Sequence, residues 1–258
     1  MPRLDDDLGH PLLIERTPSR VVSLVPSLTE ALAATVPGRL VGATEWCTHP
    51  AGLDVARVRG TKNPDHGAIG RLLPDLVVAN QEENRSLDVE RLRAAGVPVW
   101  VTVVESVDQA LRSMRRLFVD VLGVAEPEWL VAADTEWSRP PEVPPVGVIA
   151  PIWRDPWMAV GSRTFSGDIL ARLGLGHLLA DAGDRYPKLD LGALLGTHPD
   201  LVLLPDEPYP FSAEDGPEAF PGIPTSLVSG RSLTWYGPAM VTARADLVDR
   251  INAALATG

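Results

Sequence analysis

The sequence predicts an α/β protein with two lobes, each built on a parallel sheet, that are joined by a helical segment. Short apolar runs alternate with stretches whose apolar residues have helical spacing, which is typical of strands connected by helices. A proline-rich segment at 139–145 interrupts this pattern. The pattern then starts again, and short motifs of the first half recur in the second.

The recurring motifs have nearly constant spacing. The pairs are 21–25 with 146–150, 74–77 with 199–202 (both Pro-Asp-Leu-Val), and 97–98 with 223–224. The first two pairs are 125 residues apart and the third is 126 residues apart. We therefore expect two Rossmann-like lobes, at 1–104 and 146–258, with residues 105–145 as the linking helical segment.

Each predicted element follows from a local pattern. Ser27 and Glu30 have the spacing of a capping box, which predicts a helix beginning at Ser27. Gly96 is placed to end the helix before it. Strands are expected at 20–25, 40–43, 75–79, 97–103 and 146–150. Helices are expected at 68–73, 88–95, 106–122 and 128–137, with another beginning near 164–168.

Composition excludes several classes of function. The 258 residues carry a formal net charge of −11, which argues against binding to nucleic acid or to an anionic membrane surface. No apolar run is long enough to insert into a membrane. The single cysteine, Cys47, excludes an internal disulfide. The first residues lack an apolar signal region and a lipid-acceptor cysteine, so we expect a cytoplasmic protein unless a leader has been removed.

The candidate site lies beyond the predicted strands, because open parallel sheets bind ligands at the carboxyl ends of their strands. Four of the seven tryptophans fall there, and flat aromatic side chains suit a large, partly apolar small-molecule ligand. The other three, at 100, 129 and 137, are expected to pack in the core or the linker. The candidate ligand-binding residues are Pro26, Ser27, Glu45, Trp46, Lys62, Asn63, Glu82, Trp153, Arg154, Trp157, Trp235 and Tyr236.

A second hypothesis is a metal-dependent enzyme or a metal sensor. Glu45, Cys47 and His49 alternate along the chain, so they would share one face if this segment were a strand; the alternative is a loop, in which they would not. A carboxylate, a thiolate and an imidazole can together hold zinc or iron. The motifs of serine hydrolases, dinucleotide-binding folds and phosphate-binding loops are absent from the sequence.

Several stretches of the sequence resemble the substrate-binding proteins of ABC importers for cobalamin and metal chelates. These stretches are 20–30, 40–50, 60–64, 72–79, 95–100, 157–174 and 235–236. The resemblance implies the class III periplasmic-binding-protein fold, in which a backbone helix joins two lobes. It implies that cobalamin or another metal chelate binds in the cleft between them, with no catalysis and no required cofactor. It also implies aromatic contacts to a corrin ring at Trp46, near Trp157 and at Trp235.

The sequence departs from that family in three places. A further aromatic residue expected near Thr61 is absent, and the segment 126–138 is short for a backbone helix, at roughly 20 Å. The acidic residues that dock each lobe on the permease are absent at 66–68 and at 237–238. An ABC permease is therefore a possible partner by resemblance, but we expect this chain not to dock on one.

Overall fold

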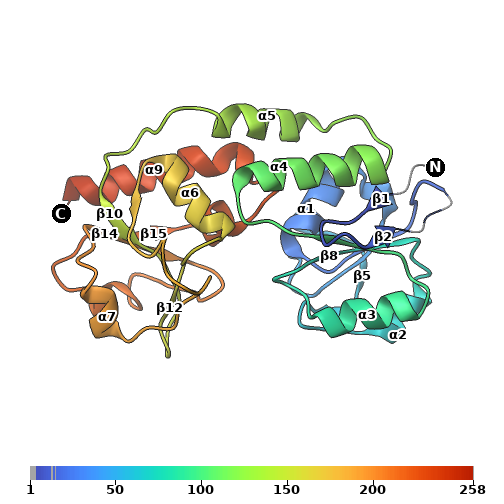
Figure 1. The fold of residues 1–258 in the computed structure, drawn as a ribbon, viewed down its shortest axis with the longest axis horizontal. Helices are drawn as coiled ribbons and strands as arrows, with labels where there is room; N and C mark the ends of the chain where they lie inside the picture. The colour runs from blue at the N-terminus through green and yellow to red at the C-terminus, as the bar shows by residue number, and fades with distance from the viewer. Residues whose placement is uncertain (1–3, 13, 15, 258) are drawn as a thin grey trace. The chain divides into compact units, whose positions relative to one another are not determined.

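The computed structural model describes residues 4–12, 14 and 16–257, and the chain forms two compact units. The N-terminal unit contains the residues up to Val104, Asp108–Ala132 and Tyr236–Pro238. The C-terminal unit contains Glu105–Val107, Ala133–Trp235 and the residues from Ala239 onward. Figure 1 shows that each unit has a central sheet with helices on both faces, which is the α/β architecture expected from the sequence.

The N-terminal unit is built on a five-stranded parallel sheet with the order β5-β4-β3-β8-β9. Its strands are β3 (Val21–Ser23), β4 (Leu40–Ala43), β5 (Ala56–Arg57), β8 (Leu76–Asn80) and β9 (Val99–Thr102). Helices α2 (His66–Arg71) and α3 (Ser86–Ala94) lie on one face, and α1 (Pro26–Thr35) and α4 (Val107–Arg115) lie on the other (Figure 1). The helix α4 continues directly into a π-helical segment, Arg116–Val121. Two small hairpins, β1 (Leu4–Asp5) with β2 (Pro11–Leu12) and β6 (Arg59–Gly60) with β7 (Asn63–Pro64), complete the unit.

The C-terminal unit is built on a four-stranded parallel sheet with the order β13-β10-β14-β15. Its strands are β10 (Gly147–Ile149), β13 (Gly176–His177), β14 (Leu201–Pro205) and β15 (Thr225–Val228). A hairpin of β11 (Pro151–Trp153) and β12 (Met158–Ala159) directly follows β10. The helices of the C-terminal unit are α6 (Phe165–Leu173), α7 (Leu191–Leu195), α8 (Gly230–Thr234) and α9 (Met240–Thr257). Figure 1 shows α7 on the opposite face of this sheet from α6 and α9. The helix α5 (Glu128–Trp137) connects the two units along the chain.

The internal repeat corresponds to equivalent strands. Leu76 and Leu201 begin β8 and β14 at a distance of 125 residues, and Val99 and Thr225 begin β9 and β15 at a distance of 126 residues. Equivalent strands also have equivalent neighbours, because β4-β3-β8-β9 matches β13-β10-β14-β15. The repeated motifs therefore mark the same structural positions in two similar sheets.

The repeated aspartate of Pro-Asp-Leu-Val has one role in both units. In the N-terminal unit, Asp75 accepts hydrogen bonds from the backbone N–H groups of Ser19 and Arg20, at 2.9 and 2.7 Å. In the C-terminal unit, Asp200 accepts from the N–H group of Gly147 at 2.7 Å. Each carboxylate thus binds the backbone at the start of the neighbouring strand, and this contact aligns the two central strands of each sheet.

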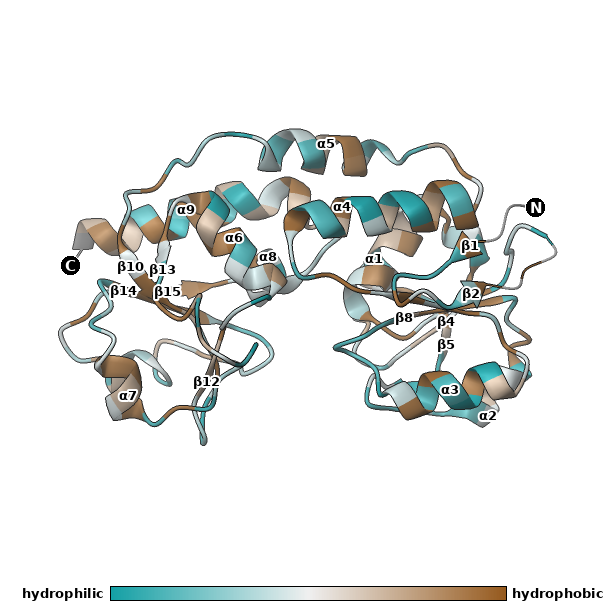
Figure 2. Cartoon of the chain, viewed as in Figure 1, coloured by the Kyte–Doolittle hydropathy of each residue, from teal (hydrophilic) through white to brown (hydrophobic). Residues whose placement is uncertain are grey.

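Each sheet buries its own apolar core. In the N-terminal unit the strands pack on α2 and α3 through Val22, Val77, Ile69 and Leu92. In the C-terminal unit the core contains Ile149, Val202, Leu194, Trp157, Phe211 and Phe220. Figure 2 shows apolar colouring along the central strands and banded colouring on α3 and α4, as expected for amphipathic helices that cover a sheet. Trp100 and Trp137 are buried, as predicted.

Two local expectations were wrong. Ser27 does not cap a helix, because α1 begins one residue earlier at Pro26, with Val25 as the N-cap and no side-chain cap hydrogen bond. Proline suits the first position of a helix, since its missing N–H has no partner there. The second helix begins at His66 instead of Ala68, because the Asp65 side chain accepts from the N–H of Ala68 at 2.8 Å. Among the described helices, none combines the length and apolar character needed to cross a bilayer.

We predict that Asp75→Asn lowers the free energy of unfolding of the N-terminal unit at neutral pH. Hydrogen bonds from Ser19 and Arg20 keep the pKa of Asp75 below its ordinary value, although partial burial raises it. The ionised carboxylate therefore stabilises the fold above about pH 3.9, and this contribution is lost as the pH falls through the lower folded-state pKa. Urea unfolding should show a loss of about 1 kcal/mol at neutral pH and a smaller difference near pH 3.

The matched control is Asp54→Asn, which changes an exposed carboxylate in the same unit. Its unfolding free energy should follow that of the unmodified protein at both pH values. Equal stability of Asp75→Asn and the unmodified protein at neutral pH would contradict the role assigned to the repeated aspartate.

Candidate ligand-binding site

Trp46 is the most exposed aromatic side chain at the carboxyl end of the first sheet. It lies in the turn after β4, and 68% of its surface is accessible. Its indole Nε1 lies close to Gly60, where an added Cβ would come within 3.2 Å of that nitrogen and 2.5 Å of Asn63 Oδ1. A side chain at position 60 would therefore displace Asn63 or the indole, which rests on the β6–β7 turn with much of its surface open to solvent.

Arg57 holds the loop that carries Trp46. Its guanidinium donates to the backbone oxygens of Thr44 and Cys47, at 3.0 and 2.9 Å, and to that of Leu53 at 3.0 Å. These three carbonyl groups span the loop on both sides of the exposed indole. Sequence reasoning did not select Arg57, because a single arginine on a short edge strand has no distinguishing local pattern.

Two buried asparagines build the loop after β8. Asn80 Oδ1 accepts from the N–H groups of Glu82 and Glu83, at 2.8 and 3.2 Å. Asn84 Oδ1 accepts from the Asn80 N–H at 2.9 Å, and its amide donates to the Thr61 oxygen at 3.0 Å. Lys62 Nζ donates to the Glu82 oxygen. The segments that carry Lys62, Asn63 and Glu82 are thus joined into one framework.

Tyr236 belongs to the N-terminal unit, although the residues before it belong to the C-terminal unit. It is 7% exposed, and burial raises the pKa of its phenol, whereas the hydroxyls of Thr102 and Ser27 oppose this shift. The next residue, Gly237, lies against the Ser27 oxygen. The start of α1, with Pro26 and Ser27, is therefore brought together with Tyr236 by tertiary contacts.

The arrangement expected for a metal at Glu45, Cys47 and His49 is wrong. These residues lie in an irregular loop instead of a strand, so they do not share one face. Glu45 and His49 are exposed, whereas Cys47 is buried and its sulfur accepts from the Thr29 hydroxyl at 3.0 Å. Burial raises the pKa of the Cys47 thiol. Across the described residues, no group of three His, Cys, Asp or Glu side chains is arranged to hold a metal ion.

The β11–β12 hairpin presents Trp153 at the carboxyl end of the second sheet. Trp153 is 43% exposed, and its ring makes an edge contact with Tyr209 at a centroid distance of 5.7 Å. The adjacent Arg154 forms ion pairs with Asp215 and Glu218, which lie in the loop after β14. Tyr209 follows β14, and its hydroxyl donates to Asp215 at 2.6 Å. The hairpin and this loop therefore form one surface.

The other two candidate tryptophans of this unit are buried at 7% exposure each. Trp157 lies in the core, stacked on Phe211 at 6.0 Å and in edge contact with Phe220 at 5.5 Å. Trp235 follows α8, and the guanidinium of Arg231 lies over its ring at 5.7 Å. Of the aromatic residues expected near 153–157, the structure exposes Trp153 and uses Trp157 for packing.

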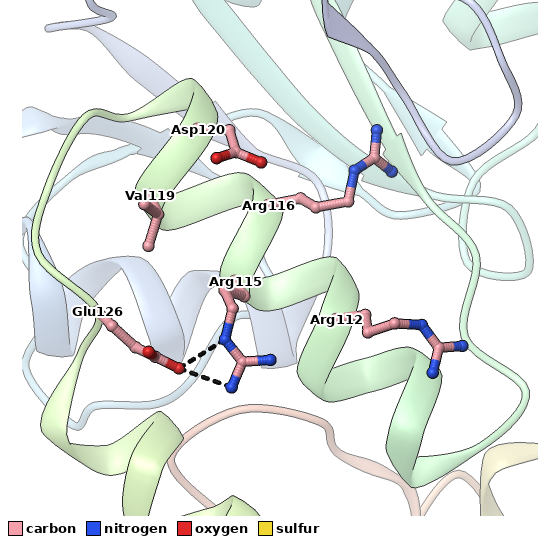
Figure 3. Close-up of a pocket in the computed structure, with 6 residues that line it drawn as sticks. All are labelled: Arg112, Arg115, Arg116, Val119, Asp120 and Glu126. Atoms are coloured by element: carbon pink, nitrogen blue, oxygen red, sulfur yellow. Dashed lines mark hydrogen bonds and ion pairs between the residues drawn. The ribbon is translucent and has the colours of Figure 1, made fainter.

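A separate hollow of about 370 Å³ lies beside the π-helical segment of the N-terminal unit (Figure 3). Figure 3 shows that its guanidinium groups come from α4 and the start of the π-helical segment. Arg115 is held by Glu126 at 2.7 Å, and Arg116 pairs with Asp7. Most of its positive charge is therefore neutralised by the protein itself, and we assign no ligand to this hollow.

Comparison with known proteins places the fold. No protein-family model matches the sequence. An uncharacterised ABC transporter substrate-binding lipoprotein of Bacillus subtilis is 26% identical over 228 residues, which cover 79% of this chain and 68% of that protein. The crystal structure of the periplasmic vitamin B12-binding protein of Vibrio cholerae superposes with a TM-score of 0.74 at 18% identity, covering 92% of this chain and 98% of that one. A periplasmic haem-binding protein of Roseiflexus sp. RS-1 gives 0.73 at 21% identity, covering 92% and 99%.

The resemblance inferred from the sequence motifs is therefore confirmed at two levels. Relatives with similar sequences include an ABC transporter substrate-binding protein, and solved structures with the same fold include binding proteins for vitamin B12 and for haem. The chain thus resembles the substrate-binding proteins of ABC importers for cobalamin and metal chelates, and it has their class III periplasmic-binding-protein fold.

Proposed function

We propose that this protein binds cobalamin or a related metal chelate through the loops at the carboxyl ends of its two sheets. The observation that carries the proposal is an exposed indole at that edge of each unit, Trp46 in one and Trp153 in the other. Large exposed aromatic side chains are unfavourable in water, and an apolar macrocycle would cover them. Solved proteins with this fold bind vitamin B12 or haem, which are ligands of that kind.

Hydrogen bonds within the loops favour a preorganised binding surface. Arg57 fixes the segment around Trp46, and Asn80 with Asn84 fixes the segment that carries Glu82. A binding surface that is ordered before the ligand arrives loses less conformational entropy on binding. Backbone and carboxylate groups held in this way are suited to orient a ligand by hydrogen bonds.

We propose binding without catalysis. Cys47, the one thiol of the chain, is buried and has a raised pKa, which leaves it unsuited to act as a nucleophile. The relatives and neighbours compared above are named as binding proteins. We propose further that the chain does not dock on an ABC permease. Asp65, the carboxylate that directly precedes the expected docking position at 66–68, is already used to cap α2.

We predict that Trp46→Ala and Trp153→Ala each weaken the binding of cyanocobalamin about fivefold, or about 1 kcal/mol, because each removes an aromatic face from the ligand. Isothermal titration calorimetry would measure the affinities. Both side chains are exposed, so the melting temperature should change little. Cyanocobalamin should also quench much of the tryptophan fluorescence of the unmodified protein.

The matched control is Leu87→Ala, which removes a 52% exposed apolar side chain from α3. It should leave the affinity unchanged. Absence of cyanocobalamin and haem binding by the unmodified protein, or equal affinities for both tryptophan variants and the unmodified protein, would refute the proposed site.

We also predict that Arg57→Gln weakens cyanocobalamin binding, because it releases the loop that holds Trp46. Loss of three hydrogen bonds to the loop should let the indole move, which lowers the affinity about threefold to tenfold. The readout is a double-mutant cycle with Trp46→Ala, in which Arg57→Gln should have little further effect once the indole is gone. Fully additive losses would show that Arg57 does not act through Trp46.

A further inference from the structure

Arg154 is bracketed by two carboxylates on the surface that exposes Trp153. One guanidinium nitrogen, Nη1, donates to both Asp215 Oδ1 and Glu218 Oε1, the latter at 2.5 Å. The Arg154 side chain is 26% exposed, whereas those of Asp215 and Glu218 are 41% and 50% exposed. Both acidic side chains are therefore exposed over a larger fraction of their surface than the arginine between them.

Both carboxylates are held in place by their second oxygens. Asp215 Oδ2 accepts from the Tyr209 hydroxyl at 2.6 Å, and Glu218 Oε2 accepts from the Gly216 N–H at 2.6 Å. Gly216 cannot carry a side chain without a shift, since a Cβ there would lie 2.7 Å from Phe211 Cδ1. The Gly216 hydrogen bond and the Arg154 charge lower the pKa of Glu218, so it is ionised at neutral pH. The arrangement is fixed and carries two negative charges against one positive charge.

In the candidate loops of the N-terminal unit, too, acidic residues outnumber basic ones. Lys62 is the cation among the residues predicted to bind ligand there, and its ammonium donates to the Glu82 oxygen. The Lys62 charge also acts on the adjacent Glu83 carboxylate. In both units, therefore, the cation selected from the sequence is already satisfied by acidic or carbonyl groups of the protein.

We propose that Asp215 and Glu218 mask the charge of Arg154, and that the protein thereby selects chelates whose side chains end in uncharged amides over chelates whose side chains end in carboxylates. The inference rests on the chelate-binding function proposed above. Amide N–H groups can donate to the exposed carboxylates. A ligand carboxylate would meet two like charges there, beside a guanidinium whose Nη1 is already paired with both of them. Corrinoids with amide side chains meet this requirement, whereas haem carries two propionate carboxylates.

The test compares two corrinoids that differ in side-chain charge. Dicyanocobinamide has side chains that end in amides, and dicyanocobyrinic acid has carboxylates in their place. The unmodified protein should prefer cobinamide by about tenfold or more. Glu218→Gln should tighten the binding of cobyrinic acid about fivefold to tenfold, because it removes one of the two negative charges beside the guanidinium, and should change the cobinamide affinity less than about twofold. Ferric haem should follow cobyrinic acid.

Four further variants make the test specific. Adding Arg154→Gln to Glu218→Gln should abolish the gain in affinity for cobyrinic acid. Asp215→Asn alone should reproduce that gain. Glu126→Gln and Asp246→Asn free Arg115 and Arg250 from ion pairs elsewhere, so they control for the change in net charge and should leave the selectivity unchanged. Melting temperatures confirm that each variant is folded.

The possible outcomes separate the two proposals. Equal affinity of the unmodified protein for both corrinoids, no gain in Glu218→Gln, or an equal gain in the control variants would overturn the masking role alone. Failure of the unmodified protein to bind any of the three chelates would overturn the proposed function, and the masking role with it.

Discussion

The contact between an aspartate and the start of the neighbouring strand organises both sheets. Asp75 accepts two backbone N–H groups before β3, and Asp200 accepts the N–H of Gly147 at the start of β10. Because the strands are parallel, alignment at their amino ends also aligns their carboxyl ends. The loops that carry the candidate ligand-binding residues depend on this alignment, since they begin where the strands stop.

The loops themselves are stabilised by hydrogen bonds from polar side chains to the loop backbone. Arg57 binds three carbonyl oxygens around Trp46, and Asn80 and Asn84 satisfy the backbone of the loop after β8. Asn80 and Asn84 are buried, and buried polar side chains with their partners in place hold a single conformation. An irregular segment can therefore present an exposed indole in a defined position, as binding by stacking requires.

Charge at the two strand-end surfaces is arranged to leave little free positive charge. Arg154 is paired with two carboxylates, and Lys62 donates to the backbone oxygen of Glu82. The overall net charge of −11 is thus reflected locally at the candidate site. Solved proteins of this fold bind both haem and vitamin B12, so the common architecture leaves the choice of ligand to local features such as these.

The sequence by itself determined the α/β class and the two similar halves, and it predicted the edge at which to seek a ligand. Repeated motifs at a spacing of 125 residues marked equivalent strands, because strand patterns and turn residues are local features. Only the tertiary structure decided that Trp153 is exposed while Trp157 packs on Phe211, and that Arg154 pairs with residues 61 and 64 positions away. Burial and ion pairing depend on contacts between distant segments, and no local periodicity encodes which segments meet.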